Sequence, residues 1–132
     1  MREHKITVGM GTDVGGGSSF SLLQTYNEAY KVQQLLGNKL SAFEGLYLST
    51  LGGARALDLE GTIGQLEVGV EADIVVLDWA ATPFLEFRLA QSHSLHDKLF
   101  ALMMLGDDRS IAATYLMGER VSKDPAGTWV PP

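Results

Sequence analysis

The 132-residue sequence contains no cysteine, only four prolines and fewer basic than acidic residues. Without cysteine the chain can form neither disulfide bonds nor thiolate metal sites, which fits a reducing compartment. Ten Lys and Arg against 16 Asp and Glu give a formal net charge of −6. This charge argues against general binding of nucleic acids or anionic membranes. We therefore expect a cytoplasmic protein with neither a nucleic-acid nor a membrane partner.

The chain also lacks any long hydrophobic run. No apolar segment approaches the roughly 20 residues that span a bilayer, and residues 1–10 lack the apolar core of a signal peptide. Hydrophobic residues make up 45% of the sequence and charged residues 20%, a composition typical of a folded domain rather than a disordered chain. The length corresponds to about one ordinary domain.

A glycine-rich segment near the N-terminus is the most informative motif. Residues 6–10 are apolar on both faces, which is typical of a strand buried in a parallel sheet. Asp13 follows this run, and three consecutive glycines at 15–17 then allow a sharp turn. Barrel enzymes carry catalytic side chains at the carboxyl ends of their strands. Asp13 is therefore a candidate active-site carboxylate and metal ligand, with a simple turn-capping role as the alternative.

Other motifs that could carry chemistry are incomplete. Residues 9–11 begin as G-x-G, but the third glycine of a dinucleotide fingerprint would fall on Val14. His93 and His96 are spaced to share one face of a helix, yet the sequence places no third ligand near them beyond Asp97. Surface or capping roles are therefore favoured for both histidines.

Periodicity and capping signals predict the secondary structure. Ser41 and Glu44 have the spacing of a capping box, which marks a helix start. The glycine pair at 52–53 indicates a kink or a close backbone contact. The expected elements are helices over 18–36, 41–51, 54–59 and 94–105, a loop over 82–89, and strands over 74–78 and 111–117, the last followed by a tight turn and a resumed strand.

The predicted elements fall into two parts. Residues 1–60 contain one strand and several helices, residues 61–122 form a small β-rich unit with one helix, and residues 123–132 form a flexible tail. Neither part supplies enough strands for an independent sheet. We therefore interpret the chain as part of something larger.

Several segments resemble the guanine deaminases of the amidohydrolase superfamily. The resemblance extends over about residues 7–121. Its most specific parts are GTDVGGG at 11–17 and LFALMMLGDDR at 99–109, whereas the segment 63–78 is generic to the superfamily. It also includes the helical segments 28–32 and 47–57.

The resemblance implies an α/β fold, namely the C-terminal fragment of a metal-dependent (β/α)8 barrel with part of a small β-sandwich. It implies zinc-dependent hydrolytic deamination of guanine to xanthine and ammonia, by a protein that forms a homo-oligomer, a dimer. Asp13 stands where the family has an aspartate that ligates zinc and carries a proton from water to the departing amine. A carboxylate beside a metal suits that task.

The sequence departs from the family pattern in its histidines. The family's zinc site also uses an H-x-H pair, further histidines and a glutamate, and none of the three histidines here stands in those contexts. Catalytic zinc ordinarily has three protein ligands, so we expect the isolated chain to be inactive and to hold zinc poorly. Two alternatives stay open: an amidohydrolase acting on another heterocycle, or a non-catalytic fragment that oligomerises through exposed strand edges.

Overall fold

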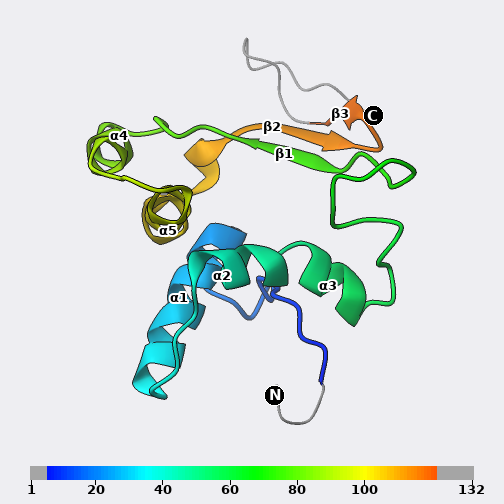
Figure 1. Cartoon of the computed structure of the whole chain (residues 1–132), viewed down its shortest axis with the longest axis horizontal. Helices are drawn as coiled ribbons and strands as arrows, with labels where there is room; N and C mark the ends of the chain where they lie inside the picture. Colours follow the sequence, from blue (N-terminus) through cyan, green and yellow to red (C-terminus); the bar gives the residue numbers. More distant parts are fainter. Residues whose placement is uncertain (1–5, 122–132) are drawn as a thin grey trace.

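The computed structural model describes residues 6–121 as a small sheet and a set of short helices. Figure 1 shows the sheet along one side of the molecule and α1, α2 and α3 on the other, with α4 and α5 at one end. The elements in chain order are α1 (Leu22–Leu35), α2 (Ala42–Leu48), α3 (Leu51–Ala56), β1 (Ile74–Leu77), α4 (Pro83–Ala90), α5 (Leu95–Leu105), the 3-10 helix η2 (Asp108–Ser110), β2 (Ile111–Leu116) and β3 (Glu119–Arg120).

The start of α2 is set by the two side chains that the sequence indicated. The Ser41 hydroxyl accepts a hydrogen bond from the Glu44 amide at 3.2 Å, and the Glu44 carboxylate accepts one from the Ser41 amide at 3.0 Å. The predicted capping box is thus confirmed. The Ser94 hydroxyl caps α5 by accepting a hydrogen bond from the Asp97 amide at 3.1 Å. The first helix begins later than predicted, at Leu22, and its N-cap residue Ser21 makes no side-chain capping bond.

The prediction of a loop over 82–89 is wrong, because these residues form α4. The Thr82 hydroxyl accepts a hydrogen bond from the Leu85 amide at 3.1 Å. Pro83 occupies the first helical turn, where its missing N–H leaves no intrahelical bond unmade. The helix then buries Leu85 almost completely. A capping threonine followed by proline was a local signal that the prediction overlooked.

The two predicted strand regions form one antiparallel sheet in the order β1-β2-β3. Ile74 on β1 stands opposite Tyr115 on β2, and the register shifts between Val76 and Leu77. The turn between β2 and β3 places Met117 at φ 52° and Gly118 at φ 84°. Two consecutive positive φ angles are characteristic of a type I′ hairpin turn, as the glycine in this turn suggests.

Residues 6–10, predicted as a buried strand, pair with no strand within the described part of the chain. Within residues 6–121 the segment instead rests on helices. The Met10 amide donates to the Leu48 carbonyl at the end of α2, with an N–O distance of 2.9 Å. The described residues therefore contain helices and a small sheet, and they do not close a barrel.

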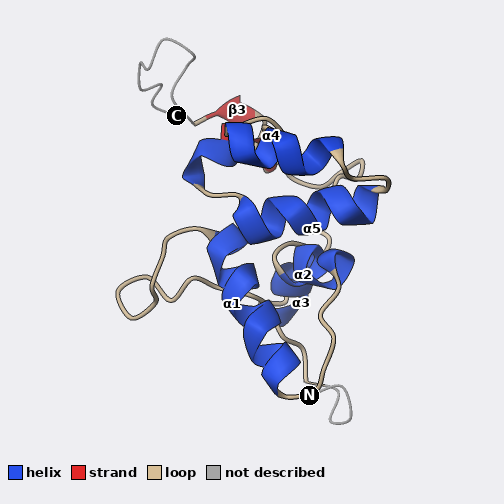
Figure 2. Ribbon diagram, turned by 90° about the vertical axis from the view of Figure 1, so that its left-hand side faces the viewer, coloured by secondary structure: helices blue, strands red, loops and turns tan. Residues whose placement is uncertain are grey.

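The main core lies where α5 packs against α1 and α2. Tyr26, Ala42, Leu99 and Met103 form its buried cluster. Figure 2 shows α4 lying over α5 on the side away from α1. Several large apolar side chains remain exposed on this chain, including Phe20, Leu35, Leu66, Val68 and Phe87.

The division of the chain at residue 60 stays a prediction, although α5 from the second part packs against two helices of the first. The predicted tail, 123–132, lies outside the described residues. Among residues 6–121, no helix combines the length and apolar character needed to cross a membrane.

Candidate functional site

Asp13 lies at a sharp, exposed reversal of the chain. Its backbone adopts φ 54°, in the left-handed region that aspartate tolerates better than most residues. Its carbonyl oxygen accepts hydrogen bonds from the amides of Gly16 and Gly17, at 2.9 and 2.5 Å. The chain therefore turns back immediately after the carboxylate, as the glycine run predicted.

The three glycines at 15–17 have different conformations or surroundings. Gly15 adopts φ 101°, which side chains strongly disfavour. A Cβ atom on Gly16 would lie 2.7 Å from Oδ2 of Asp13, and one on Gly17 would overlap the Thr12 carbonyl oxygen. The Asp13 carboxylate thus lies beside the bare backbone of Gly16.

The residues around Asp13 do not by themselves fit a complete metal site. Within 6–121, no three His, Cys, Asp or Glu side chains are grouped so that they could hold a metal ion. A catalytic zinc ion ordinarily takes three protein ligands and leaves one position open. Asp13 can therefore supply one ligand at most, and the others would have to come from outside residues 6–121.

The two histidines of the H-x-x-H motif have different surroundings. His93 is exposed just before the start of α5. His96 is half-buried, and its Nε2 accepts a hydrogen bond from the Ala42 amide at 3.4 Å. Its ring stacks on that of Phe100, with an angle of 8° between the planes. His96 therefore joins α5 to the start of α2, a contact that helical spacing alone did not indicate.

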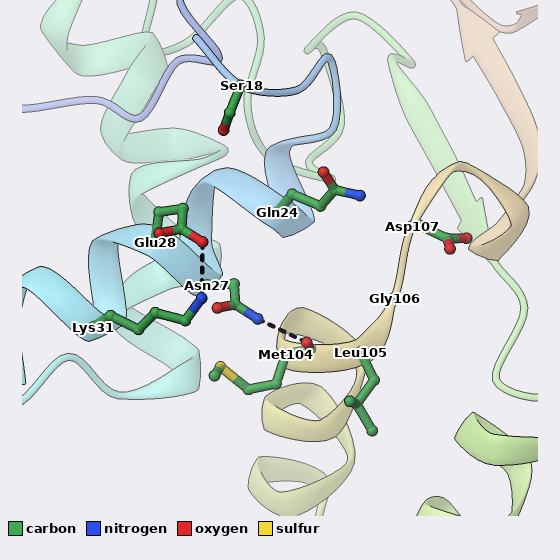
Figure 3. A pocket seen from close by; sticks show the side chains of 9 residues that line it. All are labelled: Ser18, Gln24, Asn27, Glu28, Lys31, Met104, Leu105, Gly106 and Asp107. Atoms are coloured by element: carbon green, nitrogen blue, oxygen red, sulfur yellow. Dashed lines mark hydrogen bonds and ion pairs between the residues drawn. The ribbon is translucent and has the colours of Figure 1, made fainter.

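A polar pocket of about 300 Å³ lies between α1 and the segment that follows α5 (Figure 3). The Asn27 side-chain amide donates to the Met104 carbonyl at 2.8 Å, while its buried Oδ1 has no partner among the described residues. Lys31 forms an ion pair with Glu28 at 2.8 Å. The pocket lining consists of Ser18, Gln24, Asn27, Glu28, Lys31, Met104, Leu105, Gly106 and Asp107.

This pocket offers both donors and acceptors of hydrogen bonds, among them Lys31 and Asp107. Hydrogen bonding from Arg109 lowers the pKa of Asp107, which keeps that carboxyl ionised at neutral pH. Sequence reasoning did not find Asn27, since an asparagine within a helix carries no local sign of a partner 77 residues away. Asp13 is not among the lining residues.

A second pocket, of about 420 Å³, lies beside His96 where α1, α2, α4 and α5 approach one another. Its lining mixes both charges with aromatic rings and includes Lys39, Glu44, Arg88, Asp97, Tyr30 and Phe100. The Ser94 hydroxyl, by hydrogen bonding, lowers the pKa of Asp97. Neither pocket brings Asp13 together with the histidines.

Comparison with known proteins identifies similar chains. The model of the amidohydrolase family matches residues 1–121. Guanine deaminase of Escherichia coli (strain K12) is 56% identical over 119 residues, which cover 90% of this chain and 27% of the relative. The solved structure of E. coli guanine deaminase superposes with a TM-score of 0.90 at 54% identity, over 92% of this chain and 29% of that one.

Two further guanine deaminase structures are similar. That of Bradyrhizobium japonicum has a TM-score of 0.80 at 35% identity, over 92% of this chain and 32% of that one. That of C. acetobutylicum, solved with guanine bound in its active site, has a TM-score of 0.61 at 27% identity, over 86% and 26%. These similarities confirm the resemblance and the fold class expected from the sequence. The chain spans roughly a quarter to a third of the length of these relatives.

Proposed function

Because this chain belongs to the amidohydrolase family, we propose that it contributes to a guanine deaminase, which hydrolyses guanine to xanthine and ammonia when the remainder of the fold is present. The observation that carries this proposal is the close match to E. coli guanine deaminase in both sequence and backbone. Guanine bound to the C. acetobutylicum relative supports the same substrate.

We propose Asp13 as the metal ligand that this chain supplies, and zinc as the metal. An exposed carboxylate at the start of the glycine turn is a suitable oxygen ligand. We also propose that Asp13 accepts a proton from the attacking water and returns it to the departing amine, the usual work of a general acid–base group. Because residues 6–121 offer no complete ligand set, the isolated chain should not deaminate guanine.

A chimeric enzyme tests this proposal. Residues 1–121 of this chain would replace the matching segment of E. coli guanine deaminase, and guanine consumption would be followed by absorbance. We expect Asp13→Asn to lower kcat by about 10²- to 10⁴-fold, the usual range for loss of a general acid–base group. Asparagine also tolerates the left-handed backbone at this position, so the loop should keep its shape.

Asp58 provides a matched control for the Asp13 variant. It is also an exposed aspartate at positive φ, 58°, so Asp58→Asn makes the same chemical change on the same kind of backbone. We expect this control to keep the parent kcat. A folded chimera that leaves guanine unchanged, or an Asp13→Asn variant with parent activity, would contradict the proposal.

The isolated chain gives a second test. We expect calorimetric titration of the 132-residue chain with zinc to show no tight binding, because a single carboxylate cannot hold the ion. Deamination of guanine by the isolated chain with added zinc would show that the site is complete without further polypeptide.

We further propose that the whole protein forms a homodimer in the cytoplasm. Exposed apolar side chains such as Phe84 and Phe87 of α4 support burial against other polypeptide. Light scattering on the full-length protein would give twice the monomer mass if this is correct. A clean monomer would exclude the dimer.

A further inference from the structure

The segment that leads to Asp13 is attached to the corner between α2 and α3. The Met10 amide donates to the Leu48 carbonyl at 2.9 Å. The Met10 sulfur lies 3.7 Å from the Ser49 hydroxyl, and the rest of this side chain packs against the main core. Backbone and side chain of Met10 thus hold the segment on the same corner.

Gly9 brings this segment into backbone contact with α3. A Cβ atom at position 9 would lie 2.8 Å from the Cα of Gly53 and 3.7 Å from the Cβ of Ala56. The first distance is shorter than packed carbon atoms tolerate, and a backbone atom cannot rotate away. Gly9 is not among the residues at positive φ. The requirement for glycine here is therefore one of space rather than of backbone conformation.

The contact is asymmetric. A Cβ atom on Gly53 would meet nothing closer than the Leu48 carbonyl oxygen, at 3.5 Å, which is ordinary packing. Alanine is therefore compatible with position 53, while alanine at position 9 would push the segment off the helix. This difference provides two chemically identical substitutions on the two sides of one contact.

We propose that Gly9 is a positioning residue for Asp13. Gly9 lets the chain pack directly on α3 next to the Met10–Leu48 hydrogen bond. This contact determines the position of the Asp13 carboxylate relative to the reacting atoms. Four Cα–Cα steps, at most about 14 Å, join Gly9 to Asp13, and the amides of Gly16 and Gly17 hold the Asp13 backbone at the other end through its carbonyl oxygen. A displacement at Gly9 therefore reaches Asp13. This inference rests on the role proposed above for Asp13.

The test uses the chimeric deaminase with Gly9→Ala and Gly53→Ala. We expect Gly9→Ala to lower kcat by about 10- to 100-fold, since misplacement of a catalytic group by about 1 Å can cost that much. The KM for guanine should change less than threefold, because Asp13 is proposed to act on the reaction rather than on purine binding. Gly53→Ala should keep kcat within twofold of the parent, and thermal melts would show that both variants are folded.

A parent-like kcat in folded Gly9→Ala, or an equal loss in both variants, would overturn the proposal. If Gly9→Ala does not fold, a crystal structure of the parent chimera decides. Contact between the Gly9 and Gly53 backbones together with the Met10–Leu48 hydrogen bond supports the positioning role of Gly9. Their absence overturns it. Asp13→Asn, assayed in parallel, separates the two proposals. Full activity in Asp13→Asn contradicts the role of Asp13. Loss of activity in Asp13→Asn, together with parent activity in Gly9→Ala, contradicts only the positioning role of Gly9.

Discussion

The aromatic ring of Tyr26 on α1 lies directly against the backbone of Gly45 on α2. A Cβ atom at position 45 would overlap atoms of the ring. The Tyr26 side chain is 1% exposed, and its hydroxyl donates to the Leu40 carbonyl at 3.3 Å. Gly45 therefore lets α1 and α2 approach closely enough to bury a tyrosine in the main core.

We expect Gly45→Ala to destabilise the chain by about 1–3 kcal/mol, the usual cost of adding a methyl group to a filled core. The buried ring cannot move away without disturbing its neighbours. Gly53→Ala is the matched control, because it also lies within a helix and its Cβ would meet only ordinary contacts. That control should be neutral or stabilising by up to about 1 kcal/mol through helix propensity. Chemical denaturation would measure the free energy of unfolding of both variants. Equal values would refute the close contact between Tyr26 and Gly45.

Asn27→Asp tests the hydrogen bond between α1 and α5. The substitution replaces the amide donor to Met104 with a carboxylate that faces a carbonyl oxygen at pH 7. We expect a loss of about 1–3 kcal/mol, the typical cost of an unsatisfied buried group. Protonation lets the acid donate again, so stability should recover as pH falls. Asn38→Asp, at an exposed site where the side-chain amide donates to the Gln33 side chain, should show little change. A pH-independent Asn27→Asp would argue against this interpretation.

Burial of Tyr26 should make the folded chain less stable at high pH. Burial, with smaller contributions from Tyr30 and Glu44, raises the pKa of Tyr26 from 10.0 to about 12. A folded-state pKa above the unfolded value favours the neutral phenol in the folded chain. Its contribution is therefore complete below pH 10 and is lost as pH rises towards 12. Between pH 9 and 12 the free energy of unfolding, measured by chemical denaturation, should fall more steeply with pH in the parent than in Tyr26→Phe. Parallel pH dependences in the two proteins would contradict the raised pKa of Tyr26.

Thr82 tests why α4 is a helix. Its hydroxyl accepts a hydrogen bond from the Leu85 amide at 3.1 Å. Thr82→Ala should therefore lower the free energy of unfolding by about 1 kcal/mol. Ser21 occupies the same N-cap position of α1 without a side-chain capping bond. Ser21→Ala should accordingly cost much less. If the two substitutions have equal effects in denaturation, the Thr82 cap does not determine the helix start.

Local sequence patterns predicted those features of the fold that depend on residues close together in the chain. The capping box at Ser41 and the hairpin turn at Gly118 were predictable, because each depends on residues within a few positions of one another. The same kind of signal existed at Thr82 and Pro83 and was overlooked. Residues 6–10 differ, since a strand requires a neighbour that a single segment cannot specify.

The sequence by itself determined the resemblance to guanine deaminases, the position of Asp13 before a tight glycine turn, and most of the local elements. Only the tertiary structure decided that Gly9 rests on Gly53 and that Asn27 bonds to Met104, 77 residues away. Only the structure, too, shows that Asp13 has no other ligands grouped with it within 6–121. Capping and turn propensities act over a few residues, whereas such contacts depend on how distant segments pack, which no local pattern encodes.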